Sequence, residues 1–423
     1  MKRMVLGPHD TRSSRSIRMD HHPSSMYSTA VIVIASTVVL AGSPVSAQET
    51  QPVGKSRADQ ERNADLLKGY DYSKYPSGIT GYTGQDRQQI VFERRERAIR
   101  VRVGPRGNYK AGLAELPDGK LVLAACRNNN DPDPTKKRFL IHVYQSADQG
   151  LTWQEINKTP LFGKEPSLTA LPNGMLVMSA QKGYFGPGSK YKESINMARS
   201  TDGGRTWELY DLPGADYPRN MIVEKDGSLL FIRAVKSDWS DSGDGSPNLQ
   251  LCRSKDGKTW QFSEGAVDWS YAAFGEVAAI RLKDGRLLAA LRRQIPKTKG
   301  EGFEDTVITE SSDDGEHWSK PRVMVNTAEV HVYLTQLEDG RILATYSNYH
   351  LPWGAYAIVS NDGGETWDRD HPIRLTASAD LYVGWPVTLQ LKDRSLITAS
   401  ALTAYLRQPP ETTATEVVLW RLP

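Results

Sequence analysis

One short motif occurs five times along this 423-residue chain, and this repetition limits the folds that the chain can adopt. Each copy, here called the Asp motif, reads Ser-x-Asp-x-Gly-x-Thr-Trp or a close variant, and the third copy is one residue shorter. The copies are SADQGLTW at 146–153, STDGGRTW at 200–207, SKDGKTW at 254–260, SSDDGEHW at 311–318 and SNDGGETW at 360–367. Units repeated at such a period predict a stacked or circular architecture.

A second repeat alternates with the Asp motif and has six copies. In each copy, two hydrophobic runs flank a short turn that contains Asp-Gly, Asn-Gly or, in the last copy, Asp-Arg. Such turns between β-branched or leucine-rich runs are hairpin signals, and they predict type I′ turns, which need positive φ. The turn markers are Gly119, Gly174, Gly227, Gly285, Gly340 and Arg394.

The two repeats together predict four strands in each unit. The Asp-Gly hairpin joins the first two strands, and the Asp motif joins the last two. Four-stranded units in radial repetition form a propeller, so we predict an all-β fold, a six-bladed β-propeller with four-stranded blades. The sixth unit ends with TEVVLWRLP and lacks an Asp motif. We therefore expect the N-terminal strand within Gln89–Val103 to complete the last blade and close the ring, which also covers exposed sheet edges.

Three segments are expected along the chain. Residues 1–47 combine basic residues, an apolar run over 30–42 and a final Val-Ser-Ala, as is typical of a secretory signal peptide. The apolar run is too short for a membrane span. Residues 48–88 are polar and predict an N-terminal arm or linker, and residues 89–423 predict the propeller. The protein is thus predicted to be secreted or periplasmic, with no membrane span after cleavage of the leader.

The charge of the chain gives no indication of a nucleic-acid partner. Removing the five basic and two acidic residues of the leader from totals of 53 and 50 leaves 48 of each sign, so the basic character belongs to the leader. The two cysteines, Cys126 and Cys252, are expected to be buried thiols. No Cys/His cluster has metal-ligand spacing and no Gly-rich phosphate loop occurs, so neither a metal nor a cofactor is predicted.

The repeated aspartates are predicted to stabilise turns rather than to catalyse a reaction. An Asp side chain accepts backbone N–H bonds within its own turn, Gly supplies positive φ, and Ser or Thr adds a local hydrogen bond. The Trp that ends each motif is expected to bury its ring between neighbouring blades. These aspartates are Asp148, Asp202, Asp256, Asp313 and Asp362.

The register of the repeats predicts which residues surround the central channel. The innermost strand of a propeller blade starts beside this channel, and one equivalent position lies eight residues before each turn Asp or Asn. These six ring positions are Lys110, Glu165, Pro218, Glu276, His331 and Trp385. Their neighbours include Tyr109, Arg219 and Tyr382, and the second strands end near Arg127 and Arg292. Charged and aromatic side chains that converge on a concave surface predict an active site.

With these features, the chain resembles the sialidase (neuraminidase) superfamily, whose members are six-bladed propellers with Asp motifs. The most specific likeness is the segment GEVAAIRLKDGRLLAALRR, which places Glu276 and Arg292 where sialidases carry a Glu and an Arg. The resemblance implies that Glu276 polarises a nucleophile and that Arg292 binds a substrate carboxylate.

The first blade carries a partial likeness to the same family. In the loop ACRNNNDPDPTKKR, Arg127 takes an arginine position of sialidases, and Asp131 or Asp133 takes the position of the acid/base. The alternative interpretation is a solvated connection interrupted by prolines.

Three positions depart from the sialidase pattern. The first-blade arginine aligns with Tyr109, and the neighbouring Lys110 cannot make the bidentate contact that an Arg makes with a carboxylate. In the fifth blade, His331 lies where the approach to a third Arg is expected. In the sixth blade, Trp385 aligns with the nucleophilic Tyr, and Tyr382 is the nearest tyrosine. These departures indicate a divergent branch whose substrate need not be sialic acid.

The ring residues suit a glycoside hydrolase, which needs an acid together with a base or a nucleophile. Candidates for these catalytic roles are Glu276, Glu165, His331, Tyr382 and Asp131 or Asp133. Candidates for binding the sugar are Arg292, Arg127, Arg219, Lys110, Glu165, Tyr109 and Trp385, the last with Tyr382 as a stacking surface.

We therefore predict a secreted, sialidase-like exo-glycoside hydrolase that removes a terminal acidic sugar, sialic acid or another ulosonate or uronate, from an oligosaccharide or glycan. One alternative is a polysaccharide lyase acting next to a uronate, with His331, Tyr382 and Arg292 as its reactive groups. Another alternative is a non-catalytic propeller that binds glycans.

Overall fold

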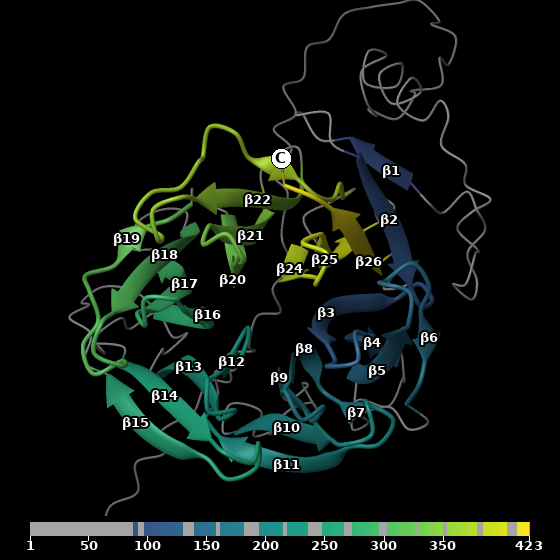
Figure 1. Ribbon diagram of the computed structural model, residues 1–423, viewed down its shortest axis with the longest axis horizontal. Helices are drawn as coiled ribbons and strands as arrows, with labels where there is room; N and C mark the ends of the chain where they lie inside the picture. Colours follow the sequence, from purple (N-terminus) through teal and green to yellow (C-terminus); the bar gives the residue numbers. More distant parts are fainter. Residues whose placement is uncertain are drawn as a thin grey trace, which may run out of the picture. The chain divides into compact units, whose positions relative to one another are not determined.

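The computed structural model has six antiparallel β-sheets arranged around a central axis (Figure 1), which confirms the predicted propeller. It describes residues 88–91, 97–129, 139–157, 161–181, 194–214, 218–235, 248–265, 273–295, 303–325, 329–349, 353–378, 384–403 and 413–422, all within the compact unit Ser56–Pro423. The predicted leader and all of the predicted arm except Gln88 lie outside these ranges. Within them, no helix has the length and apolarity needed to cross a membrane.

Blades one to three follow each other along the chain, and the first strand of each lies closest to the axis (Figure 1). Blade one contains β3 (Asn108–Glu115), β4 (Leu121–Asn128), β5 (Phe139–Ser146) and β6 (Gln154–Glu155), with β7 (Leu161–Phe162) also paired to β5. Blade two contains β8 (Lys164–Ala170), β9 (Leu176–Gln181), β10 (Ser194–Ser200) and β11 (Glu208–Pro213). Blade three contains β12 (Ile222–Val223), β13 (Leu229–Val235), β14 (Asn248–Ser254) and β15 (Gln261–Gly265).

Blades four to six complete the ring. Blade four contains β16 (Ala273–Arg281), β17 (Leu287–Ile295), β18 (Phe303–Ser311) and β19 (Arg322–Val323). Blade five contains β20 (Glu329–Gln336), β21 (Ile342–Asn348), β22 (Gly354–Ser360) and β23 (Ile373–Arg374). Blade six contains β24 (Gly384–Gln390), β25 (Leu396–Thr403), β26 (Thr413–Trp420), β2 (Arg97–Val103) and β1 (Gln88–Val91).

The ring closes as predicted, through pairing of the N-terminal segment with the last blade. Strand β2 runs antiparallel to β26, from Ile99 opposite Leu419 to Val103 opposite Thr415. The closing segment forms two strands rather than one, because β1 folds back on β2. The edge of β26 is thereby covered by two further strands, as a closed propeller requires.

The inner hairpins are of a different type from the predicted one. The N–H of Gly119 donates to the carbonyl of Leu116 at 2.8 Å, and the N–H of Leu116 donates to the carbonyl of Lys120 at 2.8 Å. Gly119 has a φ of 85°, and Asp118 is not among the residues with positive φ. The prediction of type I′ turns is therefore wrong: this is a three-residue hairpin with one left-handed residue and a G1 bulge. Arg394, with a φ of 65°, takes the Gly position in blade six.

The hydrophobic core consists of six layers, each between two neighbouring blades. The layer between blades two and three, for example, packs Val177 and Met197 against Leu229 and Phe231. Both cysteines are free thiols buried in such layers, as predicted. Each inner strand is consequently held on both sides by apolar contacts, which fixes the positions of the side chains at its start.

The Asp motifs form the turns that their composition predicts. In the first motif, Asp148 Oδ1 accepts the N–H of Thr152 at 2.8 Å, and Asp148 Oδ2 accepts its hydroxyl at 2.7 Å. The indole of Trp153 donates to the carbonyl of Gly150 at 2.9 Å and is buried in the layer between blades six and one. These aspartates are structural, and they lie at the outer hairpins of the blades.

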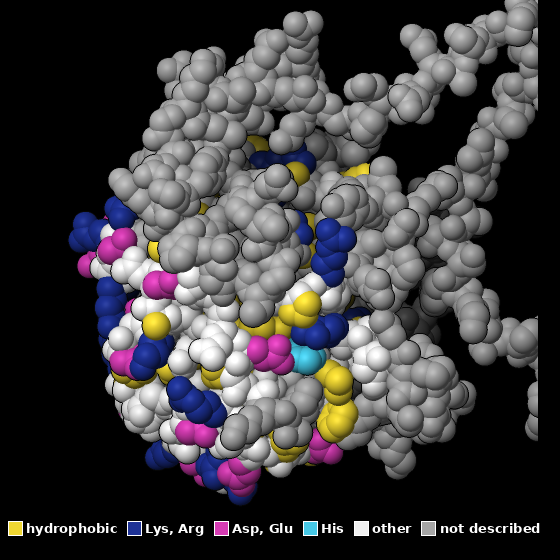
Figure 2. All heavy atoms as spheres, turned by 90° about the vertical axis from the view of Figure 1, so that its right-hand side faces the viewer, with side chains coloured by type: hydrophobic (Ala, Val, Ile, Leu, Met, Phe, Trp, Pro, Cys, Tyr) yellow, Lys and Arg dark blue, Asp and Glu magenta, His cyan; other side chains and the backbone are white. Residues whose placement is uncertain are grey.

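Acidic and basic side chains are interspersed on the side of the molecule that Figure 2 shows. Among the described residues coloured there, magenta and blue groups lie close to one another rather than in a patch of one sign. A uniformly basic stripe, which is the electrostatic footprint of nucleic-acid binding, does not occur in the part of this face that the structure describes.

Candidate active site

Five of the six ring residues share one unusual backbone conformation. The strand pairing shifts at this residue in β3, β8, β16, β20 and β24, which marks a β-bulge in each. The residues are Lys110, Glu165, Glu276, His331 and Trp385, with φ angles of 42°, 58°, 49°, 58° and 47°. All five are buried. Left-handed residues other than Gly cost energy and cluster at functional sites, and a bulge re-aims a side chain. The shared conformation indicates a functional layer at the start of the inner strands.

Glu165 of blade two lies between two lysines. Its Oε1 pairs with the ammonium of Lys110 from blade one, and Lys164 Nζ lies 3.1 Å from the same oxygen. Burial alone would raise the pKa of Glu165, but the two ammonium groups outweigh it and hold this pKa at about 2. Burial lowers the pKa of Lys110 to about 7, against the attraction of Glu165. Glu165 is therefore a permanently ionised carboxylate at neutral pH, beside a lysine that can exchange its proton near neutrality.

Glu276 of blade four forms the second ion pair of the ring. Its Oε1 accepts a hydrogen bond from Arg292 Nη1 at 2.7 Å, so the two residues that the sequence pairs are in direct contact. Its Oε2 lies 3.3 Å from His331 Nε2 of blade five. The side chain of Glu276 is only 6% exposed, and that of Arg292 is 15% exposed. The hydrogen bond from Arg292 thus orients this carboxylate, and His331 lies beside its second oxygen.

Two hydroxyl groups lie beside Nδ1 of His331. The backbone N–H of Trp385 donates to Ser347 Oγ at 3.0 Å, and this hydroxyl lies 3.1 Å from His331 Nδ1. Tyr349 Oη lies 3.3 Å from the same Nδ1. The other nitrogen, Nε2, faces Glu276 Oε2 at 3.3 Å. Burial and the surrounding cations lower the pKa of His331 well below its usual value, which keeps the ring neutral.

Trp385 is enclosed by two of the other ring residues. Lys110 Nζ lies 3.3 Å from the centre of its ring, and the imidazole of His331 lies 4.0 Å from it at an angle of 31°. Strand β24 contacts both β3 and β20, so these groups approach the indole from opposite sides. Tyr109 meets the edge of the indole at 5.4 Å. Trp385 is thus packed against other side chains of the ring, and its stacking against a sugar stays a prediction.

Blade three reaches the ring in a different way. Its predicted ring residue is Pro218, whose ring fixes φ near −65°, and its inner strand β12 has two residues only. The next residue, Arg219, donates its backbone N–H to the carbonyl of Val277 at 2.8 Å, and its carbonyl accepts from Ser167 Oγ at 3.0 Å. Blade three is thus anchored to both neighbouring blades at this point, and Arg219 is its buried ring side chain.

Among the remaining predicted residues, the structure describes only Arg127, and its hydrogen bonds within the described part of the chain are not with the ring residues. Arg127 lies at the end of β4, where Nε donates to Asn108 Oδ1 and Nη2 to Tyr144 Oη, each at 3.0 Å. Its contacts there are with neutral groups of its own blade. The predicted acid/base, Asp131 or Asp133, and the predicted alternative nucleophile, Tyr382, lie outside the described residues.

Two contributors to the site were missed in the sequence. Lys164 immediately precedes Glu165. Its charge and its place next to a ring residue are the sequence signals that could have identified it. Ser347 precedes the end of β21, and nothing in its sequence context predicts that it supports His331. Its place is visible only in the structure, where a Cβ at Gly384 would lie 1.7 Å from Ser347 Oγ. Gly384 therefore permits the close approach that brings Trp385 to this hydroxyl.

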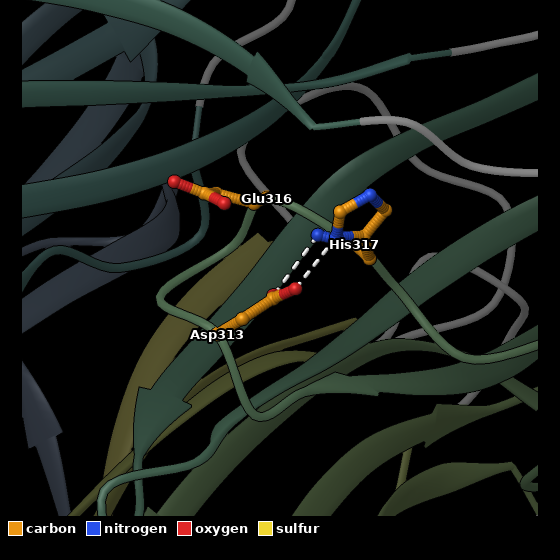
Figure 3. A group of neighbouring side chains, drawn as sticks. All are labelled: Asp313, Glu316 and His317. Atoms are coloured by element: carbon orange, nitrogen blue, oxygen red, sulfur yellow. Dashed lines mark hydrogen bonds and ion pairs between the residues drawn. The ribbon is translucent and has the colours of Figure 1, made fainter.

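Among the described residues, one group has side chains that are close enough to hold a metal ion, in the fourth Asp motif (Figure 3). Asp313 Oδ2 lies 2.6 Å from His317 Nδ1, and Asp313 Oδ1 accepts the backbone N–H of His317 at 2.9 Å. In the other Asp motifs, a Thr hydroxyl donates to the equivalent Asp oxygen. The His317 side chain thus replaces Thr in the turn, and the exposed group, which includes Glu316, is explained by the turn alone.

The repeats and the ring can be compared with those of known protein families. The BNR repeat-like domain family matches residues 90–271, 218–375 and 279–408, which together cover most of the chain. The chain belongs to this family. With its six-bladed fold and its distant sialidase relatives, this BNR repeat-like protein is a divergent member of the sialidase superfamily.

Its curated relatives are distant. A sialidase from Micromonospora viridifaciens is 26% identical over 240 residues, which are 49% of this chain and 37% of the relative. A sialidase from Paraclostridium sordellii is 22% identical over 295 residues, which are 60% of this chain and 68% of the relative. The first alignment therefore spans little more than a third of the relative's own length.

Solved structures share the fold at low sequence identity. A protein of unknown function from Dyadobacter fermentans has a TM-score of 0.60 and 20% identity, over 77% of this chain and 98% of its own. An α-L-arabinofuranosidase from Fusarium graminearum has a TM-score of 0.56 and 17% identity, over 75% and 93%. A sialidase from Streptococcus pneumoniae has a TM-score of 0.53 and 14% identity, over 75% and 69%. At these identities the likeness is one of fold.

Proposed function

We propose that this BNR repeat-like protein is an exo-acting glycoside hydrolase that removes a terminal acidic sugar from a glycan. Its curated relatives are sialidases, and its structural neighbours include a sialidase and an arabinofuranosidase. A carbohydrate is therefore the substrate class that these relationships support. The choice of an acidic sugar, a sialic acid or another ulosonate or uronate, rests on the charges of the ring.

The observation that carries the proposal is the excess of positive charge around two buried carboxylates. Glu165 and Glu276 are surrounded by four cationic side chains, those of Lys110, Lys164, Arg219 and Arg292. With His331 neutral, the cationic side chains of the described ring outnumber its carboxylates, even when Lys110, with a pKa of about 7, is counted as partly neutral. Uncompensated charge is costly in a buried site, so an anionic group on the substrate is the natural partner of this ring.

Glu276 is the carboxylate best placed to act on the anomeric carbon, as nucleophile or through a water molecule. Arg292 donates a hydrogen bond to one of its oxygens, and His331 lies beside the other, which is the kind of preorganisation that such a step requires. Glu165, with its pKa at about 2, is not a proton donor at neutral pH. Asp131 or Asp133 remains our proposed acid for the leaving group, as a glycosidase of either stereochemistry needs one.

The ring supports hydrolysis better than elimination. A lyase would need His331 as a base, and this buried imidazole lies within the ring, with Nε2 at 3.3 Å from Glu276 Oε2 and Nδ1 at 3.1 Å from Ser347 Oγ. The lowered pKa of His331 makes it a weak base.

A product assay tests the proposal. The purified chain 48–423 is incubated with sialosides, other ulosonides, uronate-capped oligosaccharides, sulfated polysaccharides and arabinan, and the products are separated by mass. We expect the release of one acidic monosaccharide that carries the mass of an added water. Release of arabinose would contradict the acidic substrate. A product lighter by one water would indicate a lyase, and binding without any product would indicate a glycan-binding propeller.

We also propose that the enzyme acts outside the cytoplasm. The support is the leader pattern of residues 1–47, which lie outside the described structure. Expression of the full chain followed by mass spectrometry of the mature N-terminus tests this location. A start near Gln48 in the extracellular or periplasmic fraction is expected, and an uncleaved protein in the cytoplasm would contradict it.

A further inference from the structure

Arg219 differs from the other three cations of the ring in its partners. Lys110 and Lys164 pair with Glu165, and Arg292 pairs with Glu276. Arg219 has no such acidic partner within ion-pair distance among the described residues, although it lies in the electrostatic field of both carboxylates. Its Nε is buried and has no acceptor in the described part of the chain.

The side chain of Arg219 crosses the centre of the propeller. Its Nη2 donates to the carbonyl of Pro386 at 3.1 Å. Pro386 belongs to β24 of blade six, which lies opposite blade three in the six-membered ring (Figure 1). The guanidinium therefore lies across the axis, at the level of the ring residues, and only 7% of the residue is exposed.

The backbone around Arg219 is held rigidly. Its N–H and carbonyl bond to blades four and two, and the following Asn220 exchanges two hydrogen bonds with Ala279, at 2.6 and 2.8 Å. A structure that positions a buried guanidinium so firmly, yet provides it with a single neutral acceptor, leaves strong donors unused. Buried arginine nitrogens without an acceptor also occur elsewhere among the described residues, for example Arg233 Nη1 and Arg374 Nε. What distinguishes Arg219 is that its unused donors lie at the level of the ring, beside the two buried carboxylates.

A second donor without an acceptor lies beside this contact in the sequence. Trp385, which precedes Pro386, has a buried indole Nε1 with no hydrogen-bond partner among the described residues. Lys110 and His331 lie against its two faces. The edge of an indole offers its N–H, which can donate to an oxygen of a bound sugar.

We infer that Arg219 is the residue that binds the carboxylate of the sugar. Lys110, in contrast, is neutralised by Glu165. A planar guanidinium with unused N–H groups can bind a carboxylate through two parallel hydrogen bonds. This inference rests on the proposed function, since it assigns the anion of the same substrate to one residue.

Binding of free sugar acids and their methyl esters tests the inference without requiring turnover. N-acetylneuraminic acid and glucuronic acid are titrated against the protein by calorimetry, each beside its uncharged methyl ester, with inorganic sulfate as a separate titrant. We expect one acid to bind at least about tenfold more tightly than its ester, because a hydrogen bond to a charged group is worth more than one to a neutral group. Arg219→Met should abolish this preference, because it weakens binding of the acid much more than binding of the ester.

Arg233→Met is the matched control. Arg233 is a buried arginine of the same blade that is bound to the neutral Gln250, with Nε–Oε1 at 2.9 Å. This variant should keep the preference for the acid. Thermal unfolding of all variants separates loss of fold from loss of binding, and Arg219→Lys, which keeps the charge but not the planar fork, provides an intermediate if the Met variant unfolds.

The outcomes separate this inference from the proposed function. Retention of the acid preference in both folded Arg219 variants would overturn the role of Arg219, even if the protein releases an acidic sugar. A wild-type protein that binds acid and ester equally would overturn it as well. If sulfate binds more tightly than both acids, the group that Arg219 binds would be a sulfate rather than a carboxylate, and the inference would be wrong on this point. The product assay could fail while the wild-type protein still prefers the acid and Arg219→Met loses this preference. That result would contradict hydrolysis but support the anion site.

Discussion

The inner strand of blade three starts differently from those of the other five blades. In the five, a bulged residue with positive φ turns its side chain into the ring, and each of these side chains contacts at least one other ring residue. In blade three, Pro218 occupies the equivalent position, and the ring side chain comes from Arg219, one residue later. The five bulged residues bind one another, whereas Arg219 extends across the axis to blade six.

The difference follows from backbone chemistry. Proline cannot adopt positive φ, so the bulge of the other blades cannot form at Pro218. The residue after it is then fixed by hydrogen bonds to the two neighbouring blades instead of by its own strand. One blade of a repeated structure has thus been changed locally, and the change supplies a cation that no carboxylate of the described ring neutralises. The five repeated bulges form the ring, and the altered blade three supplies Arg219, the cation that is available to a ligand.

The largest effect is expected at the bulged residue of blade four. Glu276→Gln should lower kcat by about 10²- to 10⁴-fold, as loss of a catalytic carboxylate does, while binding of the substrate is retained. Glu338→Gln, at an exposed carboxylate paired with Arg394, is the control and should leave kcat unchanged. Steady-state kinetics on the released sugar measures both. A loss of less than about tenfold for Glu276→Gln would remove this residue from the chemical step.

A large effect on stability is expected at the bulged residue of blade one. Lys110→Met should lower the free energy of unfolding by about 3 kcal/mol or more, because it removes a buried partner of Glu165. In contrast, Lys120→Met breaks only an exposed pair with Asp118 and should cost about 0–1 kcal/mol. Urea denaturation of the two variants compares them. Equal stabilities would show that the buried pair does not hold blades one and two together.

The pH dependence of stability tests blade five. Burial, with Arg292, Lys110 and Arg219 nearby, lowers the pKa of His331 well below 6.5 in the folded protein. Below pH 6.5 the unfolded chain therefore binds a proton that the folded protein does not, so stability is present above this pH and is lost as the pH falls. The loss should approach about 1.4 kcal/mol per pH unit.

His331→Asn removes this titration and keeps a residue type that tolerates positive φ. The slope between pH 6.5 and 5 should become shallower than that of the wild type, as measured by urea denaturation at each pH. His371→Asn, at an exposed position, serves as the matched control with the wild-type slope. If the slopes of all three proteins coincide, His331 is not the buried neutral group described above.

The smallest effect is expected at the opposite end of the inner strands, where all six blades are alike. Arg394 is the one turn marker that is not Gly, and it has a φ of 65°. Arg394→Gly should raise the free energy of unfolding by no more than about 1 kcal/mol, because it relieves a left-handed residue and gives up an exposed ion pair. The reverse change, Gly340→Arg, should lower stability by a similar amount. A strong loss for Arg394→Gly would mean that this turn differs from the other five.

The fold could be predicted from the sequence because each blade carries its own turn signals. The two repeats give the number of blades, the order of strands and the closing segment, and the count of eight residues before each turn gives the ring. The predicted type of the inner hairpin turns was wrong. Asp-Gly fits both a type I′ turn and a G1-bulge hairpin, and the choice between them depends on how the strands twist.

The contacts within the ring could not be predicted in the same way. The pairing of Lys110 with Glu165, and of Glu276 with His331, joins different blades, and no local pattern encodes the distance across the channel. The packing of Trp385 depends on side chains of blades one and five, which no pattern around Trp385 itself indicates. The path of Arg219 to Pro386 crosses the whole ring. Only the placement of six strands around one axis brings these groups together.

The most direct test of the account is a crystal structure of the Glu276→Gln variant with the released acidic sugar bound. The account predicts that the sugar carboxylate lies within hydrogen-bonding distance of the Arg219 guanidinium and that the anomeric carbon faces residue 276. It also predicts that Lys110 remains paired with Glu165. A sugar bound away from the ring, or one whose carboxylate contacts Lys110 while Arg219 contacts only Pro386, would contradict it.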